Sequence, residues 1–215
     1  MSYKTVGKTV ETEFIEKKSV FIGLASRVFS EEEAKEFIAS VKIKYKDARH
    51  HVYAYTLGEE MNIQRYSDDG EPQGTGGIPI LEVIKKNELR NVCVVVIRYF
   101  GGILLGAGGL TRAYVKGASE AISGAGIVER VSGWQLDLII EYDQLGKIQH
   151  HFKEKNIEII TVEYTDKVKV TIYLESDLTE KISSEIKNLT SGDVTISKGQ
   201  EELFYKDGNR LLKVI

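Results

Sequence analysis

The segment that most constrains the fold runs from Val94 to Tyr114 and reads VVVIRYFGGILLGAGGLTRAY. It begins with a continuous apolar run, which is typical of a β-strand covered on at least one face. It ends with apolar residues at helical spacing, and five glycines lie between the two patterns. Glycine adds no side-chain packing and raises the entropic cost of folding. We therefore expect a strand, a loop of bare main chain and a helix, in which the main chain serves a close contact or a ligand.

A second glycine-rich segment, DDGEPQGTGGIP, precedes another predicted helix and has the same character. Helix N-termini present unpaired N–H groups and the positive end of the helix dipole. Glycines let a ligand approach this main chain, so the two segments predict an anion site for phosphate or a nucleic-acid backbone. The residues of this predicted site are Arg98, Gly101, Gly102, Gly106, Gly108, Gly109, Arg112 and Lys116 from the first segment, and Gly74, Thr75, Gly76 and Gly77 from the second.

Acidic residues in the second segment allow another interpretation. Asp68, Asp69 and Glu71 would hold a divalent cation or act as acid and base, although such acids in a glycine loop are more often a solvated turn. The stretch from Gly101 to Gly109 matches neither a Gly-Lys-Ser/Thr phosphate loop nor a dinucleotide fingerprint. Glycines also permit tight turns and close helix–strand contacts without a ligand. The sequence predicts no catalytic residue, no cofactor and no metal site, since no Cys/His spacing fits zinc.

Composition limits the class of protein and its partners. With a net charge of −3, the 215 residues create no overall positive field that would attract nucleic acid. Residues 127–215 hold 12 basic and 16 acidic side chains, so a basic surface has to lie in the first part. The single cysteine, Cys93, argues against a disulfide framework, and Met1 to Lys18 does not resemble a signal peptide. We expect a cytoplasmic protein with no membrane segment.

The pattern changes near Ile127, which predicts domains at residues 1–126 and 127–215. In the first domain, a polar turn at residues 16–19 predicts a hairpin. Ser30 and Glu33 form a capping box ahead of an amphipathic helix.

The second domain shows six elements in the ferredoxin-like order β-α-β-β-α-β. They are a strand at 134–142, a helix at 143–155, strands at 157–164 and 168–175, a helix at 177–189 and a strand at 194–204.

The stretch YSDDGEPQGTGGIPILEVI, followed by NVCVVVIRYFGGILLGAGGLTRAYVKGASEAI, closely resembles the Impact family in its bacterial YigZ-like branch. The resemblance covers essentially the whole chain. It implies the fold class α+β: an N-terminal two-layer α/β domain of the ribosomal-protein domain-2 type, then a ferredoxin-like βαββαβ domain similar to modules of elongation factor G. It brings no settled catalytic residues.

The resemblance also implies a role in translation. Eukaryotic relatives regulate translation initiation through protein contacts, and bacterial members look like nucleic-acid or ribosome binders. We expect a non-enzymatic, translation-associated regulator that binds RNA or the ribosome through a glycine-rich, locally basic face of the first domain, without DNA specificity; a translation factor is a further candidate partner. Two alternatives stay open: an enzyme acting on a small phosphorylated or nucleotide ligand, and a protein-interaction module whose glycines serve only the fold.

Overall fold

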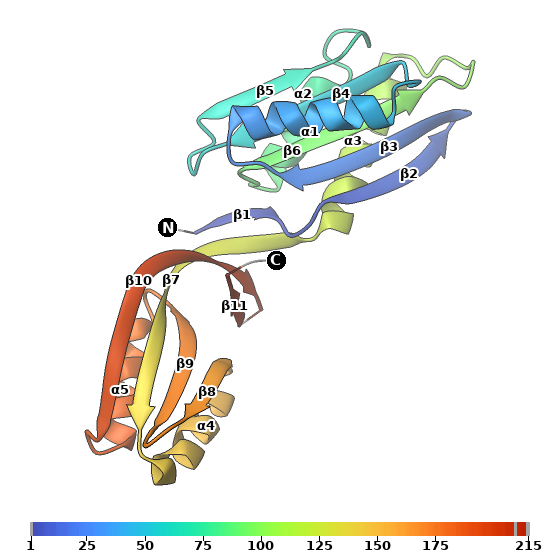
Figure 1. Cartoon of the computed structure of the whole chain (residues 1–215). Helices are drawn as coiled ribbons and strands as arrows, with labels where there is room; N and C mark the ends of the chain where they lie inside the picture. The colour runs from blue at the N-terminus through green and yellow to red at the C-terminus, as the bar shows by residue number, and fades with distance from the viewer. Residues whose placement is uncertain (1, 209, 214–215) are drawn as a thin grey trace. The chain divides into compact units, whose positions relative to one another are not determined.

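The computed structural model describes residues 2–208 and 210–213, and the chain divides into two compact units. The first unit is Tyr3–Val128, and the second runs from Glu129 onward and includes Ser2. Both units mix helices and strands (Figure 1), which confirms the α+β fold class. Within the described residues, no helix is both long and apolar enough to cross a membrane.

A five-stranded antiparallel sheet of order β2-β3-β6-β4-β5 is the centre of the first unit. Its central strand, β6, is buried along nearly its whole length, as expected for a strand covered on both faces. A short strand, β1, precedes the sheet. The bounds are β1 (Tyr3–Val6), β2 (Val10–Glu16), β3 (Ser19–Arg27), β4 (His50–Leu57), β5 (Ile63–Ser67) and β6 (Val92–Tyr99).

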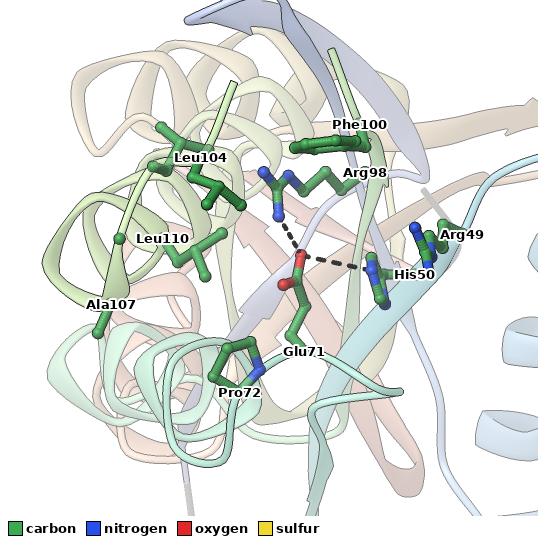
Figure 2. A pocket seen from close by; sticks show the side chains of 11 residues that line it. Arg49, His50, Glu71, Pro72, Arg98, Phe100, Leu104, Ala107 and Leu110 are labelled. Atoms are coloured by element: carbon green, nitrogen blue, oxygen red, sulfur yellow. Dashed lines mark hydrogen bonds and ion pairs between the residues drawn. The ribbon is translucent and has the colours of Figure 1, made fainter. Parts of the chain in front are cut away.

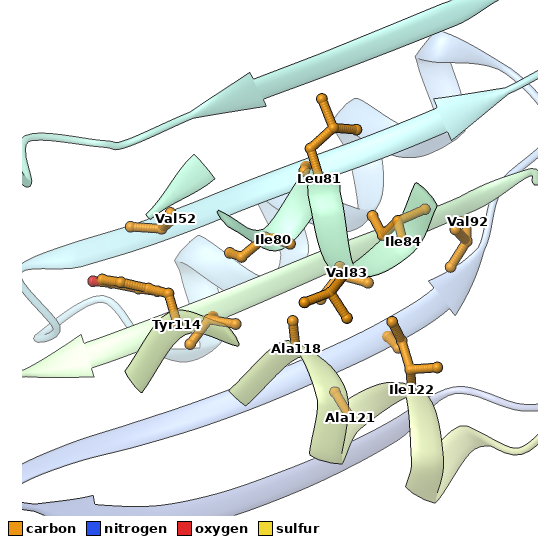
Figure 3. Packing of buried hydrophobic residues seen from close by; sticks show 14 of the residues in the cluster. Val52, Ile80, Leu81, Val83, Ile84, Val92, Tyr114, Ala118, Ala121 and Ile122 are labelled. Carbon is orange, nitrogen blue, oxygen red and sulfur yellow. The ribbon is translucent and has the colours of Figure 1, made fainter. Parts of the chain in front are cut away.

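Helices cover both faces of this sheet. On one face, α1 (Glu31–Lys44) packs the side chains of Ala34, Ile38 and Val41. On the other face, α2 (Gly77–Lys86) and α3 (Ala107–Ala125) lie together, as Figure 3 shows. The unit thus has three layers rather than the two expected. Apolar residues occupy successive positions of β6 and so point to both faces of the sheet, and each face needs a cover.

Cys93 lies on the α1 face of the sheet and is fully buried. Burial raises the pKa of its thiol, because the charged thiolate is unfavourable in an apolar environment. The cysteine is therefore a core residue.

The local predictions for the first unit are confirmed. The β2–β3 hairpin turns at Lys17 and Lys18, which have φ values of 45° and 67°. Ser30 caps α1, because its Oγ accepts a hydrogen bond from the Glu33 N–H at 3.1 Å. The Glu33 carboxylate in turn accepts from the Phe29 N–H at 2.8 Å, so the capping box forms one residue further back than its usual pattern.

The second unit has the predicted ferredoxin-like topology. Its strands lie in the order β10-β7-β9-β8 with antiparallel neighbours, and its helices pack on one face of that sheet. A further strand, β11, pairs with β10 and was not predicted, because so short a strand carries little pattern. The bounds are β7 (Ile127–Ile140), a 3-10 turn η1 (Tyr142–Gln144), α4 (Leu145–Glu154), β8 (Ile159–Tyr164), β9 (Val168–Glu175), α5 (Thr179–Leu189), β10 (Val194–Asp207) and β11 (Arg210–Leu212).

Candidate functional site

The glycine-rich segment before α2 is filled by the protein's own carboxylate. Asp68 Oδ2 accepts from the Gly74 N–H at 2.8 Å, and Oδ1 accepts from the N–H groups of Gly76 and Gly77 at 3.0 and 2.8 Å. The Thr75 N–H donates to a main-chain carbonyl. These four amides are therefore not available to an external anion, which corrects the expectation for this segment. A negative charge already sits at the positive end of α2.

The three acidic residues of this segment do not form one site. Asp69 Oδ1 lies 2.9 Å from Lys42 Nζ, and Oδ2 accepts from the His51 N–H at 2.7 Å. Burial opposes ionisation of Asp69, but these two partners outweigh it and hold its pKa below the usual range. Asp68 caps a helix, Asp69 ties β4 to α1, and Glu71 faces a cavity. The prediction of an acidic site is wrong because the three side chains have separate partners.

The segment before α3 is open. Its N-cap is Gly106, at φ 71° and ψ 164°, and no side chain of the described residues caps the helix. Essentially only glycine adopts this conformation, so a capping Ser, Thr or Asp is excluded from the position. Gly108 and Gly109 lie in the first helical turn, and Gly102, at φ 83°, has open space around it. The N-terminus of α3 therefore remains accessible to a ligand.

Gly101 serves packing instead. A Cβ at this position would lie 2.0 Å from the carbonyl of Lys18, far inside van der Waals contact. The Gly101 N–H is also used, since it donates to Ser19 Oγ at 3.2 Å. This part of the predicted anion site is a close contact between β3 and the end of β6.

A cavity of about 360 Å³ lies beside the open end of α3 (Figure 2). Its walls come from the start of β4, the loop after β5, the end of β6, the loop into α3, and α3 itself. All of these segments belong to the first unit. The cavity thus joins parts of the chain that are far apart in sequence.

A buried hydrogen-bonded cluster forms the floor of the cavity. Glu71 Oε1 accepts from Arg98 Nη1 and from the Tyr114 hydroxyl, each at 2.8 Å. Arg98 is only 5% exposed, so it is not the surface cation that we expected to contact RNA phosphate. Burial, assisted by the nearby Glu71 carboxylate, raises the pKa of Tyr114, which keeps its hydroxyl as a donor.

His50 extends this cluster. Its Nδ1 lies 2.9 Å from the main-chain oxygen of Asp69. A carbonyl oxygen only accepts, so Nδ1 carries a proton and donates it; in the neutral form of the ring, Nε2 is then the acceptor. Nε2 is 4.0 Å from Glu71 Oε1 (Figure 2). Sequence reasoning missed His50; the signal is its register opposite Arg98 in the β4–β6 pairing, which is known only once the strands are paired.

A smaller depression of about 200 Å³ gathers cations from two elements. Lys17 comes from the β2–β3 turn, and Arg112 and Lys116 come from α3. We call these three residues the basic groove. All three side chains are exposed, and Lys116 Nζ lies 4.3 Å from the centre of the Phe14 ring. Arg112 and Lys116 were expected in the site, and Lys17 was not.

Comparisons with known proteins cover both units. Residues 17–122 match the Impact N-terminal domain, and residues 138–193 match a domain of unknown function, DUF1949. The chain is 41% identical over 210 residues to the IMPACT family member YvyE of Bacillus subtilis, covering 98% of this chain and 97% of that protein. It is 33% identical over 182 residues to the IMPACT family member YigZ of Escherichia coli, covering 84% and 89%.

Among solved structures, the crystal structure of a hypothetical protein is similar to the whole chain. The TM-score is 0.59 at 31% sequence identity, with 94% of this chain and 98% of that chain covered. The basic groove and the cavity both lie within the stretch that matches the Impact N-terminal domain.

Proposed function

Since the chain belongs to the IMPACT family, we propose that it is a non-enzymatic, translation-associated regulator of the cytoplasm that binds RNA, free or within the ribosome, through the basic groove. The observation that carries this proposal is the convergence of Lys17, Arg112 and Lys116 in one depression, which extends to Gly109 in the first turn of the uncapped helix α3. Exposed cations beside the positive end of a helix dipole favour phosphate groups.

The groove fits phosphates better than bases. Its volume of about 200 Å³ is small, and its charged groups are exposed at the surface. Lys116 also lies 3.8 Å from Glu120, but exposed pairs of this kind contribute little, so they do not withhold the cation from a phosphate. Phosphate contacts supply affinity without reading the sequence. We therefore expect binding that falls steeply with salt and depends little on RNA sequence.

The test is a fluorescence-anisotropy titration of single-stranded and structured RNA at several salt concentrations. We expect the double variant Arg112→Glu, Lys116→Glu to lose at least about tenfold in affinity for single strands. The slope of log affinity against log salt should fall by about 1.4, since two phosphate contacts are lost. Absence of binding by the parent protein at low salt would refute the proposal.

A matched control makes the same change of charge elsewhere. Lys35 in α1 and Lys46 just after it are exposed, and α1 covers the opposite face of the sheet from α3. The variant Lys35→Glu, Lys46→Glu should keep the parent's salt slope. If both double variants weaken binding equally, net charge rather than the groove accounts for it, and the proposal fails.

A further inference from the structure

We propose that the cavity beside α3 binds one ribonucleoside monophosphate, either free or as the phosphorylated end of an RNA chain. This site is distinct from the basic groove, since of the residues lining the two only Leu105 is shared. It goes beyond the proposed function because it holds a single small ligand in a partly enclosed space. Three parts of the cavity match the three parts of such a ligand.

The phosphate belongs at the end formed by α3. Gly106 and Ala107, at that helix end, line the cavity together with Arg98, whereas Arg49 lies on the other side of Glu71, beside His50 (Figure 2). Arg98 is more than nine-tenths buried, and its Nε has no hydrogen-bond partner within the described chain. An unpaired buried donor of this kind is costly unless a further group satisfies it. The Arg98 Nε–H and the positive end of the helix dipole are therefore the groups that would bind the phosphate.

The ribose belongs beside His50 and Glu71. Within the described part of the chain, both hydrogen bonds of the Glu71 carboxylate go to Oε1, which leaves Oε2 to accept from a ligand. His50 Nε2, which is an acceptor in the neutral form of the ring, lies 4.0 Å from the same carboxylate. Two neighbouring acceptors fit the two neighbouring hydroxyl donors of a ribose, as acidic residues do in dinucleotide sites.

The base belongs against the apolar wall. Leu104 is 82% exposed and Phe100 is 43% exposed, and both line the cavity together with Leu110. Figure 2 shows Arg98 lying between Phe100 and Glu71, so the apolar and acidic parts are on either side of the guanidinium. Bare apolar side chains around a cavity mark a ligand site. A volume of about 360 Å³ suits one nucleotide rather than two.

The test uses the full chain and isothermal titration calorimetry with AMP, GMP, CMP and UMP. We expect at least one of these to bind at least tenfold more tightly than its nucleoside, than its 2′-deoxy form and than inorganic phosphate. Failure of all four to bind at millimolar concentration overturns the proposal. A nucleoside that binds as tightly as its monophosphate also overturns it, because the phosphate end then contributes nothing.

Two exposed residues allow the site to be altered without disturbing the core. Arg49→Ala and Leu104→Ser should each weaken nucleotide binding about tenfold, whereas Lys46→Ala, at an exposed residue three positions before Arg49 that does not line the cavity, should not. If both cavity variants bind as the parent does, the nucleotide lies elsewhere and the proposal fails. A 5′-phosphorylated RNA decamer that displaces the mononucleotide, where its 5′-hydroxyl form does not, identifies the RNA end as the source. If neither decamer displaces the mononucleotide, the ligand of the cavity is the free nucleotide.

The same variants keep this proposal separate from the proposed function. Arg112→Glu with Lys116→Glu should leave mononucleotide affinity unchanged, and Arg49→Ala should leave the salt slope for unphosphorylated RNA unchanged. Loss of mononucleotide binding in the groove variant would show one site rather than two and would overturn the inference.

Discussion

The segment before α2 and the segment before α3 both bring glycines to the N-terminus of a helix, but only the first contains its own anion. Asp68 bonds three of the amides before α2. Before α3, the backbone conformation of Gly106 excludes a capping side chain at that position, and no remote carboxylate of the described residues takes the role that Asp68 has at α2. The difference teaches that a glycine-rich helix entry indicates a ligand site only when the chain supplies no acceptor for its amides.

The largest expected effect comes from removing the Asp68 carboxylate from the segment before α2, which we call the closed segment. Asp68→Ala removes three hydrogen bonds to a charged acceptor, and we expect the free energy of unfolding to fall by about 3 kcal/mol. Urea denaturation of the full chain, followed through the first unit's transition, measures it. Asp68→Asn keeps one acceptor oxygen and should lose less. A loss below about 1 kcal/mol in the alanine variant would contradict the capping role.

A smaller effect is expected from adding a methyl group at Gly77, where the same segment enters α2. In Gly77→Ala the new Cβ would lie 2.9 to 3.0 Å from the main chain of Ser67. These Ser67 atoms belong to the main chain, so the clash is relieved only if α2 shifts against β5. We expect the free energy of unfolding to fall by about 2 kcal/mol. The same denaturation experiment applies. An unchanged midpoint would mean that α2 moves freely and that the closed segment is not tightly packed.

The matching change in the open segment should have the opposite sign. Gly108 is exposed and helical, and a Cβ there would meet only Arg112 Nη1, at 3.6 Å. Gly108→Ala should therefore raise the free energy of unfolding by about 0.5 kcal/mol, because alanine favours the helix. Thermal melting of parent and variant shows the shift, and a lower melting temperature would contradict the openness of this segment.

The smallest effect is a dependence on pH from Asp69, beside the closed segment. Its pKa is lower in the folded chain than in the unfolded one. Its contribution to stability is therefore present above the unfolded-state pKa and is lost as pH falls through the folded-state pKa. Denaturation at about pH 6 and about pH 3 should show a smaller acid loss in Asp69→Asn than in the parent. Equal losses would assign the acid sensitivity to other carboxylates.

Local patterns predicted most of the fold. Three features depend only on residues that are close together in the sequence, so their patterns can be recognised there directly. They are the Ser30–Glu33 cap, the turn at Lys17 and the buried stripe of α3. The ferredoxin-like order of the second unit was predictable for the same reason, because each element carries its own period.

The candidate site was less predictable because its bonds span the chain. Glu71 and Arg98 are 27 residues apart, and Glu71 and Tyr114 are 43 apart. Tyr114 looked like a core residue of the α3 stripe, and its hydroxyl reaches Glu71 only because α3 packs on the sheet. Asp68 looked like a solvated turn residue, since its amide partners follow six to nine residues later.

The complete burial of Cys93 has a practical consequence. This residue is the single cysteine of the chain and is fully buried against α1. A thiol introduced by Leu104→Cys, on the rim of the cavity, would be the only sulfhydryl that a maleimide dye reaches in the folded protein. An optical reporter of cavity occupancy can thus be attached without first removing any native thiol.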